Sequence, residues 1–242
     1  MRPDTDSTTP STVLVLGAGF SRAVSDAMPL TDELGNLVLA RIDDRRLPAP
    51  STSFSGGYFE AWLSRFAEDQ PDLRTDENLL NRYWFTRITT AIHEILTDRE
   101  RAALENSPPA WLLRLLGIMH SERMTAISFN YDTLVEHAIA THMLFDWQQH
   151  LRASWHDVVD HLPPLPPQPM RWGGPGATTF RLLKLHGSTN TYWVPGDNSG
   201  ATIHRWDLFG CWGAPEPQDE ERRRRELPGR EPFVVPPAAS KS

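Results

Sequence analysis

Residues 12–24 read TVLVLGAGFSRAV, a short β-branched and apolar run that stops at Gly17. Such a run is typical of a strand covered on both faces, as the strands of a parallel sheet are. Gly17 and Gly19 let the backbone approach a pyrophosphate group, and the helix predicted to follow would offer its free N–H groups. Arg22 stands where the common dinucleotide-binding pattern GxGxxG has its third glycine, so that fingerprint is absent. A tight strand-to-helix turn without a ligand is the alternative interpretation.

Two further short strands are predicted, in MTAISFN (124–130) and in TTFRLLKLHGS (178–188). Helical patterns fill residues 52–122 and resume after Asp132. The alternation predicts an α/β fold: a Rossmann-like parallel sheet flanked by helices, with a mainly helical insertion over 52–122 after the first βα unit. Because ligands bind outside the carboxyl ends of parallel strands, the polar residues that end the three strands predict one shared site.

The second and third strand ends carry side chains suited to binding and proton transfer. The Asn130 amide can orient a ribose hydroxyl or a water, and the Asp132 carboxylate can accept from a carboxamide or a sugar hydroxyl. Both residues are also natural caps for the helix predicted to begin near Thr133. The His186 imidazole can take a proton from a ribose hydroxyl or an attacking water, whereas a buried histidine at the strand end is the alternative.

Together, GAGFS (17–21), FNYD (129–132) and KLHGS (184–188) resemble the sirtuin superfamily, in this order and at these separations. More narrowly, they are similar to the sirtuin-like NAD-hydrolysing domains of bacterial anti-phage defence proteins. The similarity runs from Thr12 to Ser188, and EPFVVPP (231–237) is similar to a segment further along those domains.

The resemblance implies that NAD is the substrate and that the bond between nicotinamide and ribose is broken. It implies that Asn130 lies beside the nicotinamide ribose and is needed for cleavage, that His186 acts on the ribose or on water, and that Asp132 contacts nicotinamide. The other residues implied to bind NAD are Gly17, Ala18, Gly19, Phe20, Ser21, Gly187 and Ser188. Since loss of nicotinamide leaves an oxocarbenium-like ribose, the site should favour developing positive charge.

The sequence departs from the protein-deacylase sirtuins, which usually carry a zinc module of four cysteines. Cys211 is the only cysteine, so no zinc module is expected, and the small domain that shapes the peptide groove would lack its metal. Water, rather than an acyl-lysine, is therefore the favoured acceptor. The chain also stops earlier than family members, which continue with further strands, so we expect a fragment or a truncated member.

The expected organisation has four parts: a disordered lead over residues 1–10, one sirtuin-like α/β domain over 11–213, a flexible charged segment over 214–231, and a C-terminal end over 232–242. In the defence proteins an additional domain commonly senses infection and oligomerises the enzyme. The partners implied here are NAD and either a second copy of the chain or a fused or partner sensor domain.

The 242 residues carry a net charge of −7, which argues against a nucleic-acid surface despite the run Arg222 to Arg225. No apolar run is long enough to span a membrane, and the polar N-terminus lacks the core of a secretory signal, so a cytoplasmic location is expected. No metal is expected, because the sequence spacing pairs none of the following histidines on one helix face: His137, His142, His150, His156 and His161.

Three functions follow from the sequence. The first is an NAD glycohydrolase, in which Asn130 and His186 are catalytic, acting in anti-phage defence. The second is a module that binds NAD or ADP-ribose without turnover. The third, an NAD-dependent protein deacylase, is disfavoured by the missing cysteines.

Overall fold

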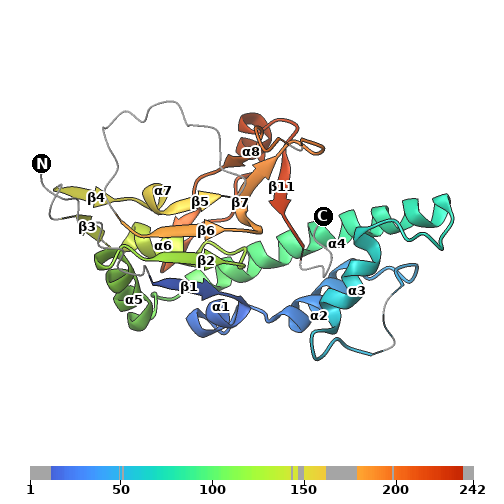
Figure 1. Ribbon diagram of the computed structural model, residues 1–242, viewed down its shortest axis with the longest axis horizontal. Coiled ribbons are helices and arrows are strands. Elements are labelled where there is room, and N and C mark those ends of the chain that lie inside the picture. The colour runs from blue at the N-terminus through green and yellow to red at the C-terminus, as the bar shows by residue number, and fades with distance from the viewer. Residues whose placement is uncertain are drawn as a thin grey trace, which may run out of the picture.

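The computed structural model describes residues 12–48, 50, 52–142, 144–146, 150–161, 179–197 and 199–236 (Figure 1). Its central feature is a four-stranded parallel sheet in the order β1-β2-β6-β5, which comprises β1 (Val13–Leu16), β2 (Thr125–Ser128), β6 (Arg181–Lys184) and β5 (Val159–His161). The parallel sheet predicted from the sequence is therefore present. In the usual doubly wound order the first strand lies inside the sheet, whereas β1 lies at an edge of the described strands, so these strands show a parallel α/β sheet and do not by themselves confirm the Rossmann-like part of the prediction.

Eight helices accompany the strands in the described part of the chain: α1 (Ala18–Val24), α2 (Thr31–Ile42), α3 (Tyr58–Ala67), α4 (Thr75–Leu104), α5 (Ala110–Ser121), α6 (Leu134–Thr141), α7 (Trp155–Val158) and α8 (Glu220–Glu226). Helices α3, α4 and α5 occupy the range predicted to be helical. Helices α2 and α3 pack on α4. In Figure 1, α4 begins at the right of the view, passes α2 and α3, and runs toward the sheet. Among the described helices, none has the length and apolarity needed to cross a bilayer.

One face of α4 is buried because apolar side chains recur at helical spacing along it. Trp84, Ile88 and Ile92 lie four residues apart, and each is at most 1% exposed. This stripe joins α2 and α3 to the same hydrophobic core as the sheet. The helical insertion is therefore one structural unit with the sheet, and it can contribute to a site beside it.

A second, antiparallel sheet in the order β11-β7-β8 was not predicted; it comprises β7 (Gly187–Trp193), β8 (His204–Arg205) and β11 (Glu231–Val234). Two small hairpins pair β3 (Leu144–Asp146) with β4 (Leu151–Ala153), and β9 (Gly210–Cys211) with β10 (Ala214–Pro215). The segment 214–231, predicted to be flexible, contains β10 and α8. Within it Arg222 forms ion pairs with Glu226 at 2.8 Å and with Asp207 at 3.2 Å. The predicted disordered lead, residues 1–10, lies outside the described residues.

The prediction that the first strand is covered on both faces is wrong for the described part of the chain. Leu16 is buried, but Val13 is 51% exposed and Val15 is 66% exposed. Successive side chains of a strand point to opposite faces, so the two valines share the face that turns away from Leu16. The apolar run of β1 therefore does not by itself indicate that both faces of this strand are covered.

Candidate functional site

The three predicted strand ends lie side by side at one edge of the parallel sheet. Leu16 is paired with Ser128, and Ser128 with Lys184, at the last positions of β1, β2 and β6. The hydrogen bonding continues one step further, because the Phe129 N–H donates to the Leu16 carbonyl at 2.9 Å. The chain thus leaves all three strands at the same level, and the polar residues that follow are brought together.

Asn130, Ser21 and Asp132 form a buried hydrogen-bonded trio across two of these strand ends. The Ser21 hydroxyl donates to Asp132 Oδ2 at 2.5 Å and accepts from Asn130 Nδ2 at 2.8 Å. The same Asn130 nitrogen donates to the Gly17 carbonyl at 2.9 Å. Ser21, which the resemblance assigned to NAD binding, thus positions the side chains of Asn130 and Asp132 through its hydroxyl.

The two capping alternatives for this segment are resolved differently. Asp132 Oδ1 accepts from the Leu134 N–H at 3.3 Å, so Asp132 forms a turn that leads into α6, although the N-cap position itself is taken by Thr133. The Asn130 side chain instead turns toward the turn after β1. Its amide uses Nδ2 in the two bonds above, and its acceptor Oδ1 makes no hydrogen bond with the described residues. Oδ1 is the amide atom left for a ligand.

His186 follows β6 and is held between two aromatic rings. Its ring centroid lies 5.1 Å from that of Phe129 and 5.9 Å from that of Tyr131, which it stacks upon. The backbone around it is fixed through Val235, whose N–H donates to the His186 carbonyl at 2.9 Å and whose carbonyl accepts from the Tyr131 hydroxyl at 2.7 Å. Burial raises the pKa of Tyr131, so this hydroxyl stays protonated and keeps its bond.

An open pocket with about 620 Å³ of empty volume connects these residues. Its wall at the strand ends includes Ala18, Ser21, Asn130, Asp132 and His186, which come from all three predicted clusters. The turn before α2 and the helices α2, α3 and α4 supply the rest, which comprises Met28, Pro29, Thr31, Leu34, Glu60 and Leu96, and the aromatic residues Phe129 and Tyr131 complete it. Among the described residues that line it there are two carboxylates and no lysine or arginine.

The glycines of the turn have no packing or conformational role. A Cβ added at Gly17 or at Gly19 would meet no atom within 4 Å, and neither residue adopts a positive φ. A tight corner that needed glycine would show one of these two features. Both positions instead border open space at the strand end. A ligand could therefore contact the backbone of these glycines without meeting a side chain.

Five residues that the resemblance assigned to NAD binding do not line this pocket. Two of them are the glycines Gly17 and Gly19 described above, and the other three make contacts within the protein. Phe20 packs edge-to-face on Trp111 of α5, with the ring centroids 5.7 Å apart. The Ser188 hydroxyl donates to the Tyr131 carbonyl at 3.0 Å. Gly187 lies against the backbone of Phe233. The structure gives these three residues roles in packing and in joining β7 to the strand ends.

Conversely, Glu60 and the apolar wall from α2 and α4 were not predicted from the sequence. Their helical patterns were recognised, but a helix pattern does not tell which other element its faces meet. Lys184 was also missed. Its ammonium donates to the Asp132 carbonyl at 2.5 Å and lies 3.3 Å from Glu136 Oε1, and both side chains are 2% exposed. A lysine inside a short apolar strand was the available signal, since buried lysines are paired.

Within the described residues there is no group of three or more His, Cys, Asp or Glu side chains that could hold a metal ion. No protein-family model, curated protein or solved structure matches this chain.

Proposed function

We propose that the chain is an NAD glycohydrolase related to the sirtuins, which cleaves the nicotinamide–ribose bond with water and releases nicotinamide and ADP-ribose. The observation that carries the proposal is the pocket at the strand ends, where Asn130, Asp132 and His186 from the sirtuin-like motifs meet. The resemblance also suggests anti-phage defence as the setting.

The charge of the pocket supports a reaction that develops positive charge. As nicotinamide leaves, the ribose becomes oxocarbenium-like, and carboxylates near it lower the energy of that state. Glu60 and Asp132 lie on the wall, and among the described residues that line it there is no lysine or arginine. The same wall is poorly suited to phosphates, so it fits the nicotinamide riboside end of NAD, and the open glycines Gly17 and Gly19 fit the diphosphate.

Each catalytic residue has a task that its geometry allows. The free acceptor Oδ1 of Asn130 can bind a ribose hydroxyl or orient the attacking water. His186 can accept the proton that this water or hydroxyl loses. Water then forms the new bond to the ribose carbon that nicotinamide has left, and the shared electron pair of the broken bond departs with nicotinamide.

The test of this function is nicotinamide release from NAD by the purified protein, followed by chromatography. Release is expected from NAD and not from NADH, because reduced nicotinamide lacks the positively charged ring that makes it a good leaving group. Equal release from both would indicate a different reaction. No release from NAD at any pH between 5 and 9 would rule out the hydrolase.

A separate test addresses the glycine turn. Gly19→Ala adds a methyl group where nothing lies within 4 Å, inside helix α1. The protein is expected to become more stable by about 0.5–1 kcal/mol, because alanine loses less backbone entropy in a helix. KM for NAD is expected to rise about tenfold, as for a loss of roughly 1.4 kcal/mol of binding. Thermal denaturation and steady-state kinetics measure the two effects.

The matched control is Gly117→Ala, another helical glycine with open space around its Cβ position. It should raise stability in the same way and leave KM unchanged. If Gly19→Ala behaved like this control in both measurements, the glycine turn would have no part in binding NAD.

A binding module without turnover is the second candidate, and one observation favours it. Asp132 uses both carboxylate oxygens within the protein, and the Asn130 amide uses its donor nitrogen there. A site whose polar side chains already bond to one another can bind NAD without cleaving it. NAD would then raise the melting temperature although no nicotinamide is released.

A further inference from the structure

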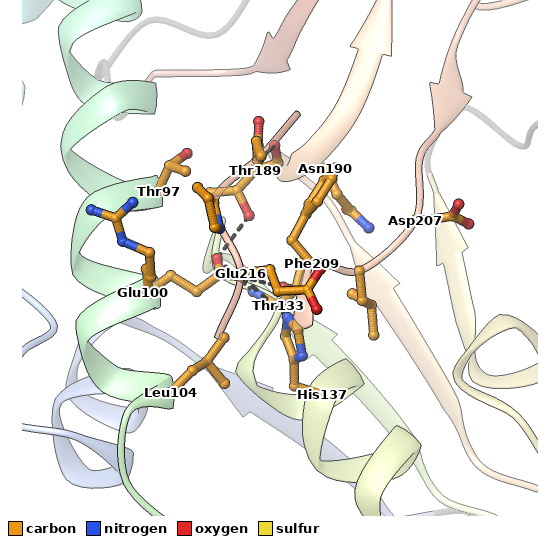
Figure 2. A pocket seen from close by; sticks show the side chains of 14 residues that line it. Thr97, Glu100, Leu104, Thr133, His137, Thr189, Asn190, Asp207, Phe209 and Glu216 are labelled. Atoms are coloured by element: carbon orange, nitrogen blue, oxygen red, sulfur yellow. Dashed lines mark hydrogen bonds and ion pairs between the residues drawn. The ribbon is translucent and has the colours of Figure 1, made fainter. Parts of the chain in front are cut away.

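Glu100, on the last turns of α4, reaches two of the strand-end segments that form the site. Its carboxylate accepts from the Thr133 N–H at 3.1 Å and from the Thr189 hydroxyl at 2.8 Å, both at Oε2. Its other oxygen, Oε1, accepts from the Thr133 hydroxyl. Figure 2 shows the side chain extending from α4 toward Thr133 and Thr189, with the bonds dashed. One carboxylate therefore joins α4, the segment before α6, and β7.

These partners adjoin residues of the proposed site. Thr133 directly follows Asp132, and the Thr189 N–H donates to the Tyr131 carbonyl at 2.8 Å. The segment 130–133 is thus held on one side by Ser21 and on the other by Glu100. Without the Glu100 carboxylate, Thr133 would lose both of its bonds to α4, and Asp132 would keep its bonds to Ser21 and Lys184 but have an unanchored neighbour.

We propose that Glu100 is a positioning residue, whose ionised carboxylate holds segment 130–133 against β7 and thereby fixes Asn130 and Asp132 in the pocket. This inference deepens the proposed function and rests on it for its activity measurement. Glu100 itself lines a separate pocket, formed by α4, α6, β7 and the loops around residues 207–209 and 216–218.

The surroundings of Glu100 make its protonation relevant near neutral pH. Burial raises the pKa of Glu100 to about 7, and the nearby Asp132 carboxylate acts in the same direction. His137 Nε2 lies 3.8 Å from Glu100 Oε1, but burial lowers the pKa of His137 to about 4, so it is neutral and does not offset the charge. The other charged groups lining this pocket are Arg101 of α4 and the loop residues Asp207 and Glu216.

Protonation changes what this carboxylate can do. In the ionised form both oxygens only accept, which matches the three donors of Thr133 and Thr189. A protonated carboxyl must donate from one oxygen, so at least one of the three bonds is weakened or lost. The segment 130–133 should therefore be held less firmly below pH 7 than above it.

The experiment compares the wild type with Glu100→Gln, Glu100→Ala and the matched control Glu94→Gln, which changes an exposed glutamate of the same helix. In the wild type, kcat for NAD cleavage is expected to fall about tenfold for each pH unit below 7. Glu100→Gln should make this fall shallower, leaving only the part that comes from the proton acceptor His186, and it should lower kcat at pH 8 more than it raises KM. Glu100→Ala should show the larger loss, and Glu94→Gln should match the wild type.

A second measurement does not depend on NAD cleavage. Amide hydrogen exchange of segment 130–134, compared between proteins at the same pH, should be slower in the wild type than in Glu100→Gln at pH 8 and equal at pH 6. If this difference is found although the wild type releases no nicotinamide, Glu100 is the positioning residue and the proposed hydrolase is wrong. If exchange and the pH profile are the same in Glu100→Gln as in the wild type, the inference is overturned.

Discussion

Replacing Asn130 by alanine is expected to lower kcat for nicotinamide release from NAD by at least about a hundredfold, the usual scale for losing one polar group that acts in the transition state. The change removes the acceptor Oδ1 that makes no bond with the described residues, and with it the amide that bridges Gly17 and Ser21. Binding of NAD should weaken much less, since the glycine turn remains. Single-turnover kinetics and a thermal-shift titration with NAD separate the two effects.

Two variants control this result. Asn130→Asp keeps an acceptor oxygen at Oδ1 and the shape but loses the donor to Gly17 and Ser21, so it should retain more activity than alanine if Oδ1 is what acts. Asn78→Ala removes a distant asparagine that bonds to the Gln70 backbone, and it should leave kcat unchanged. Full activity in Asn130→Ala would place the chemistry elsewhere in the pocket.

Replacing Gly187 by alanine is expected to cost on the order of 4 kcal/mol of unfolding free energy, in the range of severe single substitutions. Gly187 has φ of +77°, which alone costs an alanine about 1–2 kcal/mol. Its new Cβ would also lie 1.9 Å from the Phe233 carbonyl oxygen, so β11 would have to move away from β7. Urea unfolding followed by circular dichroism measures the loss.

Gly196→Ala separates the two causes, because Gly196 has φ of +86° and open space around its Cβ position. That variant should lose only about 1–2 kcal/mol. If Gly187→Ala were no worse than Gly196→Ala, the contact between Gly187 and Phe233 would not be close in solution, and the attachment of β11 beside His186 would have to be revised.

The arrangement of the strand ends could be predicted from the sequence because it depends on local signals. The apolar runs before Gly17, Asn130 and His186 predict the three strands, and parallel pairing puts their carboxyl ends at one edge. The register of Leu16, Ser128 and Lys184 bears this out. The pocket there is lined by residues of all three motifs, although five residues assigned to NAD binding do not line it: Gly17, Gly19, Phe20, Gly187 and Ser188.

The rest of the site could not be predicted because it depends on contacts between distant segments. Glu60 and Leu96 belong to helices whose patterns fix a buried face but not the neighbour that covers it. The attachment of β11 to β7 joins segments whose sequences give only weak strand signals, as short strands do. Both faces of β1 were predicted to be covered because its valines are apolar. Whether a valine is buried depends on which other element packs against its face, and the sequence of the strand does not give that element.

The pairing of β1 with β2 has a consequence for the order of folding. Val13 pairs with Thr125, and all of α1 to α5 lies between them in the chain. Closing a loop of that length is entropically costly, so contacts among the intervening helices, which are closer in sequence, should form first. We expect α2, α3 and α4 to collapse on one another early, and β1 to dock late against a preformed surface. The strand ends that carry Ser21 and Asn130 would then meet only in the final steps of folding.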